Sequence, residues 1–179
     1  MKKLILGLGF FGIAITHGDA KTYEAIKGES RITYFLKHPL HKVEGVAKDF
    51  FCKVELTDDT LGSAIRVKAP VTAFNSGNSN RDSHTLEILE AFKFPTVEFA
   101  SDSVRRKEKG YRVFGQLTFH GVKRPVDFEV IPSYPAGKIR ITGSFTVKLT
   151  DFKVKRPTLL MVPTEDALRI ELDLVAAGP

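Results

Sequence analysis

The sequence contains one cysteine and no tryptophan among its 179 residues. A single cysteine excludes an internal disulfide, so side-chain packing has to hold the fold together. Cys52 alternates with Phe50, Val54 and Leu56 on one apolar face. We therefore expect its thiol to be buried and unreactive.

Several motifs that carry chemistry are also missing. The chain has no G-x-S-x-G elbow, no paired carboxylates, no phosphate-binding loop and no cofactor fingerprint, and we expect no cofactor. The formal net charge is +6, but the basic residues are scattered and no recognition motif accompanies them. Nucleic acid is therefore not an expected partner.

The first twenty residues form a separate segment. A basic start at Lys2 and Lys3 precedes an apolar run from Leu4 to Thr16, and small residues follow at Gly18 and Ala20. This pattern predicts a signal peptide over residues 1–20 with cleavage after Ala20; an uncleaved anchor is the alternative. We expect a periplasmic or secreted protein that, after cleavage, has no stable membrane insertion and consists of a single domain over residues 21–179.

Apolar and polar residues alternate through most of the remaining chain, which is typical of half-buried strands. Fourteen phenylalanines supply large apolar side chains for an interior. The fold class is therefore all-β, and eight antiparallel strands with one buried face can form a barrel or a sandwich. The expected strands lie near residues 30–37, 50–56, 65–71, 97–99, 111–119, 126–130, 139–147 and 168–174.

One helix is predicted, from Ser83 to Phe92, after the third of these strands. A polar loop precedes it and Pro95 follows it. Leu86, Leu89 and Phe92 would form its apolar stripe, and Asp82 or Ser83 would cap its first turn.

The helix start reads Arg81-Asp82-Ser83-His84, and it contains the three residue types of a serine hydrolase. Consecutive side chains diverge, whereas a catalytic triad has to converge, so a capped helix with Arg81 and Asp82 bound to loops is the simpler interpretation. His38 and His41 are spaced like a pair of metal ligands, but Pro39 lies between them. We expect no metal site there.

Four segments in order resemble the YceI-like family of bacterial secreted proteins. They are Lys37-His38 at a strand end, Gly45 in VEGVAKDF, Arg81-Asp82-Ser83-His84 followed by AFKFPTVEFAS, and LTFHGVKRPV from Leu117 to Val126. The chain departs from the family pattern at Glu29, Thr85, Leu149 and Lys153.

The resemblance implies an eight-stranded antiparallel, lipocalin-like barrel that holds a polyisoprenoid or similar amphiphile without enzymatic chemistry. A filled barrel acting as an interaction or stress-response scaffold is the alternative, and a metal-dependent hydrolase is a third. Whether the chain forms a homodimer stays open. The expected ligand-binding residues are Ile32, Tyr34, Leu36, His38, Arg81, His84, Val113, Leu117, Phe119 and His120.

Overall fold

The computed structural model describes residues 20–57, 60–135, 137–159 and 161–178. The signal peptide expected over residues 1–20 lies outside them, apart from Ala20. The elements in chain order are β1 (Ala20–Ala25), β2 (Arg31–His38), β3 (His41–Ala47), β4 (Phe51–Thr57), β5 (Thr60–Pro70), the 3-10 helix η1 (Val71–Ala73), β6 (Phe74–Asn75), α1 (Ser79–Ile88), β7 (Thr96–Arg106), β8 (Tyr111–Phe119), β9 (Val122–Ser133), β10 (Lys138–Lys148), the 3-10 helix η2 (Thr150–Phe152), β11 (Thr158–Leu159), β12 (Val162–Pro163) and β13 (Ala167–Ala177).

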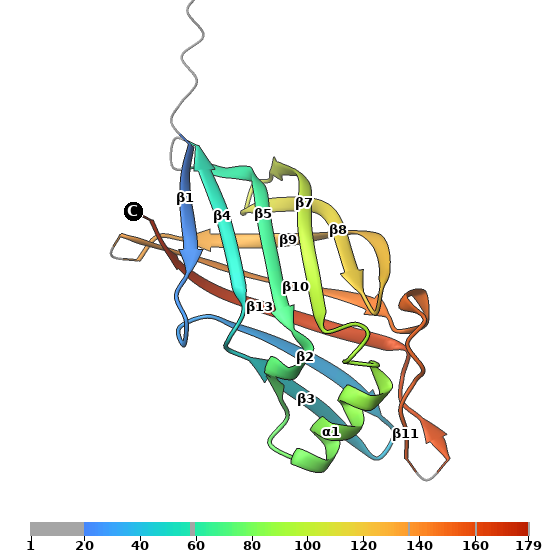
Figure 1. Cartoon of the computed structure of the whole chain (residues 1–179). Helices are drawn as coiled ribbons and strands as arrows, with labels where there is room; N and C mark the ends of the chain where they lie inside the picture. Colours follow the sequence, from blue (N-terminus) through green and yellow to red (C-terminus); the bar gives the residue numbers. More distant parts are fainter. Residues whose placement is uncertain (1–19, 58–59, 136, 160, 179) are drawn as a thin grey trace, which may run out of the picture.

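Eight of the described strands form a closed antiparallel barrel, which confirms the expected architecture. They follow one another in the order β1-β4-β5-β7-β8-β9-β10-β13, and pairing of β1 with β13 closes the ring. β2, β3 and β6 continue the sheet beyond β13 at the other end, where α1 and the β11–β12 hairpin also lie (Figure 1). The two ends of the barrel are therefore built differently.

The predicted position of the helix is wrong. α1 follows β6 rather than a third strand, because β1, β3 and β6 escape the alternation analysis. The inward positions of β3 are Val43, Gly45 and Ala47, which give a weak apolar signal. Only glycine fits at position 45, because a Cβ there would lie 2.4 Å from the Tyr34 ring on the paired strand.

The half of the barrel near β1 is packed with side chains. Its inward residues are buried and belong to the main hydrophobic core. Cys52 is among them, and burial raises the pKa of its thiol to about 12, so the expectation of an unreactive cysteine is confirmed. The core residues of this half are Cys52, Val54, Leu56, Leu61, Ile65, Tyr111, Val113, Val130, Ile139, Ile141, Leu174 and Ala176.

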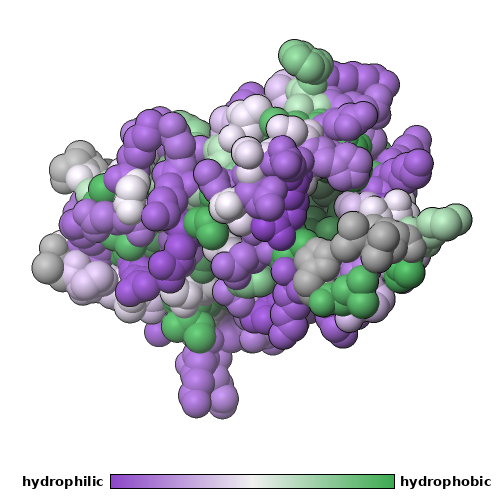
Figure 2. All heavy atoms as spheres, turned by 90° about the horizontal axis from the view of Figure 1, so that it is seen from below, coloured by the Kyte–Doolittle hydropathy of each residue, from purple (hydrophilic) through white to green (hydrophobic). Residues whose placement is uncertain are grey.

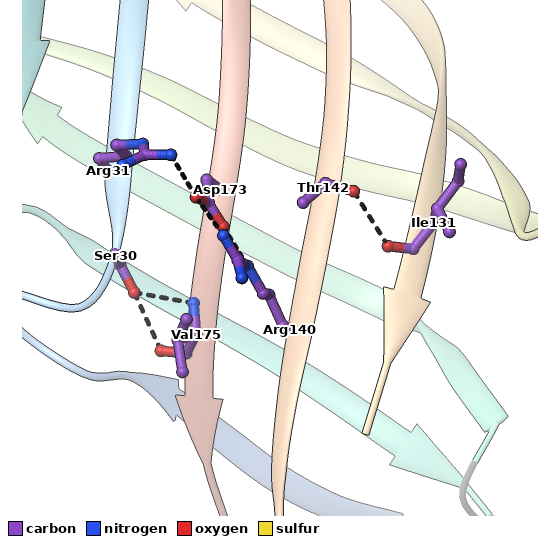
Figure 3. Close-up of polar contacts among 7 residues, drawn as sticks. All are labelled: Ser30, Arg31, Ile131, Arg140, Thr142, Asp173 and Val175. Carbon is purple, nitrogen blue, oxygen red and sulfur yellow. Dashed lines mark hydrogen bonds and ion pairs between the residues drawn. The ribbon is translucent and has the colours of Figure 1, made fainter. Parts of the chain in front are cut away.

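One edge of β13 is shared by two strands. β2 pairs with residues 168–173, and β1 pairs with residues 176–177. Between them, the buried Ser30 hydroxyl accepts a hydrogen bond from Val175 N (3.0 Å) and donates one to Val175 O (2.9 Å), as Figure 3 shows. Val175 O also accepts a hydrogen bond from Ile26 N (2.7 Å), so the Ser30 side chain stands in for a backbone acceptor at Val175 N, where β1 gives way to β2.

Charged side chains cross the same strands on the outside of the barrel. Asp173 on β13 binds Arg31 on β2 (2.8 Å) and Arg140 on β10 (2.7 and 2.8 Å) (Figure 3). The hydrogen bond from Arg140, with Arg140 and Arg31 as nearby positive charges, holds the pKa of the Asp173 carboxyl below its usual value. The Asp173 carboxylate therefore stays charged and links three neighbouring strands.

We predict that Ser30→Ala lowers the free energy of unfolding by about 1–3 kcal/mol, because the buried Val175 N–H loses its partner. Urea denaturation measures the change. Ser144→Ala on β10 is the matched control, since Ser144 is exposed, and it should change the free energy by less than about 0.5 kcal/mol. Equal effects of the two substitutions would contradict this role of Ser30.

Candidate functional site

The half of the barrel away from β1 encloses an apolar cavity of about 490 Å³. This volume lies within the roughly 300–1,000 Å³ that is usual for small-molecule sites. The cavity is lined by inward side chains of β2, β5, β7, β8, β9, β10 and β13, by α1 and by the β11–β12 hairpin. The apolar lining includes Ile32, Leu36, Val67, Ala69, Val97, Phe99, Leu117, Phe119, Phe128, Phe145, Val147, Leu168, Ile170 and Leu172.

Three phenylalanines form the floor of this cavity. The rings of Phe99 and Phe128 lie 5.3 Å apart, and Phe128 stacks on Phe145 at 4.7 Å. Phe128 pairs directly with Val113 of the packed half, so the phenylalanines mark the boundary between the two halves. Gly115 makes room for this layer, because a Cβ on Gly115 would lie 2.6 Å from the Phe99 ring.

Tyr34 provides a polar group near the mouth of the cavity. Its ring lies over Gly45 and 5.7 Å from the Phe74 ring. Burial, together with the nearby Asp82 carboxylate, raises the pKa of the Tyr34 phenol above its usual value. The phenol is therefore neutral at physiological pH; it hydrogen-bonds the Thr85 side chain and can still take a further hydrogen-bond partner.

α1 covers one side of the mouth and is fixed by its own first turn. Asn78 caps the helix by accepting a hydrogen bond from Arg81 N (3.0 Å), so the expected cap at Asp82 or Ser83 is wrong. Asp82 accepts from Ser76 N (3.1 Å), and Arg81 Nε donates to Ser76 Oγ (3.0 Å). The expectation that Arg81 and Asp82 hold a neighbouring loop is confirmed.

The helix turns a mixed face toward the cavity. The expected stripe of Leu86, Leu89 and Phe92 is correct only for Leu89, and Phe92 is fully exposed beyond the end of α1. The helix begins four residues earlier than expected and already ends at Ile88, so Phe92 lies outside it. The inward residues of this segment are Arg81, His84, Thr85, Ile88 and Leu89.

His38 and Thr164 also line the cavity, next to the β11–β12 hairpin. The buried His38 ring accepts a hydrogen bond from Leu40 N at Nδ1 (3.2 Å), so Nε2 carries the hydrogen and donates to Val162 O (3.0 Å). Thr164 Oγ1 is the buried side-chain polar atom that lacks a hydrogen-bond partner in the described part of the chain. Figure 2 looks onto this end and shows hydrophobic residues recessed among hydrophilic ones.

Eight of the ten expected ligand-binding residues line the cavity: Ile32, Tyr34, Leu36, His38, Arg81, His84, Leu117 and Phe119. Their contact with a ligand stays a prediction. Val113 does not line the cavity, because it lies in the packed half with no exposed surface. His120 does not line it either, since the β8–β9 turn directs its ring to Phe152 O (3.1 Å) and the Glu90 carboxylate (3.0 Å).

The arrangement does not assemble the catalytic or metal chemistry considered for these residues. Asp82 is bound to Ser76, and His84 lies 3.5 Å from Glu87 rather than near Asp82. Both ring nitrogens of His38 are occupied, and the His41 side chain lies outside the described part. Among the described residues, no three His, Cys, Asp or Glu side chains gather into a metal-binding group.

Sequence reasoning missed the contribution of the segment after β10. Val154, Pro157, Thr158 and Thr164 all line the cavity, yet the expected strands skip from 147 to 168. Strands β11 and β12 are two residues each, which is too short for alternation to be read. The segment Lys155-Arg156-Pro157 indicates a loop, but nothing in these three residues indicates that the loop folds back over the mouth.

The comparisons with known proteins agree with this fold. The YceI-like domain matches residues 23–176 of the chain. Protein YceI of Salmonella agona (strain SL483) is 30% identical over 138 residues, which are 72% of this chain and 72% of that protein.

Several solved structures are similar over most of the chain. Burkholderia cenocepacia BcnA has a TM-score of 0.78 and 19% identity, covering 86% of this chain and 99% of its own. A polyisoprenoid binding domain from Saccharophagus degradans has a TM-score of 0.65 and 11% identity, covering 88% and 98%. At these identities the similarity shows the fold alone.

We predict that the two halves of the barrel respond differently to the same enlargement. Ala176→Phe in the packed half should lower the free energy of unfolding by about 1–3 kcal/mol or more, since no space receives the ring. Ala69→Phe should change it by less than about 1 kcal/mol, because its ring can enter the cavity. Urea denaturation of both variants measures this, and equal destabilisation would show that the cavity is not open in solution.

Proposed function

Because the chain belongs to the YceI-like domain family, we propose that it binds a polyisoprenoid or a similar long-chain amphiphile inside its barrel. The observation that carries this proposal is the 490 Å³ apolar cavity, which is closed by phenylalanines at one end and has polar groups at the other. A polyisoprenoid binding domain among the structurally similar proteins supports the same ligand class. The function is binding and involves no catalysis.

The hydrophobic effect supplies enough free energy for such a ligand. Each buried CH₂ contributes about 0.8 kcal/mol, so ten of them give about 8 kcal/mol, which corresponds to a Kd near 1 μM before the cost of ordering the chain. The cavity wall offers the required contact, because its lining is mostly Leu, Ile, Val and Phe.

The polar end of the ligand would lie at the mouth. The buried and unpartnered Thr164 Oγ1 faces the cavity there, together with the Tyr34 phenol. A buried hydroxyl without a partner costs free energy in the empty protein, and a ligand head group could remove that cost. Thr164 and Tyr34 thus favour an amphiphile over a plain hydrocarbon.

The proposed location is the periplasm or the exterior, reached through the signal peptide over residues 1–20. In that compartment a prenyl chain is insoluble in water and needs a shielded path or store. The alternative of a scaffold with a filled barrel fits the cavity less well, because only the half near β1 is packed.

The first test is extraction of the purified protein. We expect that the full chain, produced in a bacterium with its N-terminal segment and purified without detergent, releases a prenyl-chain lipid into organic solvent, as seen by mass spectrometry. Ala69→Phe should reduce the amount, because its ring takes up cavity volume. Ala100→Phe is the control, since Ala100 follows the inward Phe99 on β7 and faces outward.

Two results together would contradict the proposal. One is the repeated absence of lipid from the extracts. The other is a failure of added prenyl alcohol to bind the protein after the extraction.

A second prediction concerns Thr164→Val, which replaces the hydroxyl by a methyl group of similar size. The free protein should be as stable as before or slightly more stable, because an unpaired buried hydroxyl is removed. Binding of a prenyl alcohol should weaken roughly three- to tenfold, whereas binding of the matching prenyl hydrocarbon should be unchanged. Calorimetric titration with both ligands measures the difference, and equal effects on the two would exclude Thr164 from the head-group site.

A further inference from the structure

Large apolar side chains are exposed beside the cavity mouth. Seven such residues are exposed in the described part of the chain, and three of them lie on two hairpin tips at this end. Leu40, at the β2–β3 turn, is 66% exposed, while Met161 and Val162 of the β11–β12 hairpin are 96% and 40% exposed. Clustered exposed apolar residues commonly mark an interaction surface.

The two tips are held together as one unit. The His38 ring connects them, because it bonds to Leu40 N on one side and to Val162 O on the other. Beside it, Glu165 N donates to Lys37 O (2.7 Å), and the side chains of Lys37 and Glu165 form an ion pair (2.8 Å). The apolar tips therefore have a fixed position relative to each other and to the mouth.

Met161 lies in a turn position that does not suit it. Its φ is 64°, in the left-handed region that glycine and asparagine adopt at least cost. The side chain is almost fully exposed, so burial does not compensate for the backbone conformation. Folding alone gives no reason for a methionine here, whereas a surface that inserts an apolar tip does.

Basic residues are frequent in the two segments that carry these tips. Residues 37–44 and 153–165 contain five Lys or Arg (Lys37, Lys42, Lys153, Lys155 and Arg156) and two acidic residues, Glu44 and Glu165. Glu165 is already paired with Lys37. That pair is neutral as a whole, and the remaining Lys42, Lys153, Lys155 and Arg156 against Glu44 leave the two segments with a net positive charge, which fits a negatively charged surface.

We propose that this end of the barrel, defined by Leu40, Met161 and Val162 with the flanking Lys42 and Lys155, docks reversibly onto an anionic lipid bilayer. The tips enter the interfacial region while the lysines meet the lipid head groups. The cavity mouth then faces the membrane, so a prenyl chain can move between bilayer and barrel without crossing water. That purpose rests on the proposed function, whereas the docking itself does not.

The charge and the small size of the two tips favour a bilayer over a second copy of the chain. A symmetric dimer through these tips would bring two patches of the same positive charge together, and like charges close to each other are unfavourable. A stable protein interface also uses about 20–30 residues on each side, which is far more than two hairpin tips offer. No helix in the described part of the chain is long and apolar enough to cross a membrane.

The experiment is flotation of the full chain with vesicles, one set of phosphatidylcholine and one with added phosphatidylglycerol. Binding should be clear only with phosphatidylglycerol and should fall as salt rises. Leu40→Ser combined with Met161→Ser should lower the partition coefficient by about tenfold or more. Lys42→Gln combined with Lys155→Gln should also lower it roughly tenfold.

Matched controls distinguish an effect of this surface from the effect of removing any lysine or any exposed apolar side chain. Lys107→Gln with Lys109→Gln makes the same charge change in the β7–β8 turn at the other end of the barrel (Figure 1), and Ile131→Ser removes an exposed apolar residue elsewhere. Both should leave vesicle binding unchanged. Thermal unfolding of every variant checks that it is folded.

Three results would overturn the docking proposal: no binding to either vesicle, equal loss in the control variants, or a Met161-dependent dimer seen by light scattering without vesicle binding. Prenyl alcohol binding in solution is measured in parallel. If the protein does not bind vesicles but still binds prenyl alcohol, the docking proposal is wrong and the proposed function stands. If it binds vesicles but not prenyl alcohol, the docking proposal stands and the proposed function is wrong.

Discussion

One edge of β13 is longer than either strand that pairs with it, so β1 and β2 share that edge. This sharing determines the shape of the barrel. β1 pairs with the C-terminal end of β13 and continues into β4, which closes the ring. β2 pairs with the remaining edge and carries β3 outward instead. The buried Ser30 hydroxyl supports the change of partner, because it accepts the hydrogen bond of Val175 N at the junction, while Val175 O accepts from Ile26 N as well as from Ser30.

The two ends of the barrel follow from that change of partner. Where β1 and β4 close the ring, the inward side chains meet and fill the interior. Where β2 and β3 lead away, the strands no longer converge, and α1 and the β11–β12 hairpin border the opening. Phe99, Phe128 and Phe145 separate the halves. A space that is apolar, closed below and polar at its mouth matches the shape of an amphiphile, and this match underlies the proposed function.

The sequence predicted what depends on local alternation. The eight expected strands all exist, and inward residues such as Leu36 and Leu117 line the cavity as alternation requires. Prediction failed where alternation carries no information: the depth of a residue in the barrel, the residue that caps a helix, and very short strands. Val113 was expected in the cavity because alternation gives the face but not the depth. Asn78 was missed as the helix cap, and Thr164 was missed because two-residue strands carry no periodicity.

The central claim is that the open half of the barrel is a binding site with a defined depth. The most direct measurement is the affinity of the purified protein for a series of prenyl alcohols of increasing length. The account predicts that affinity rises with each added isoprene unit, by up to about 0.8 kcal/mol per buried carbon, and then levels off once the chain reaches the phenylalanine floor. An affinity that does not depend on chain length would contradict it.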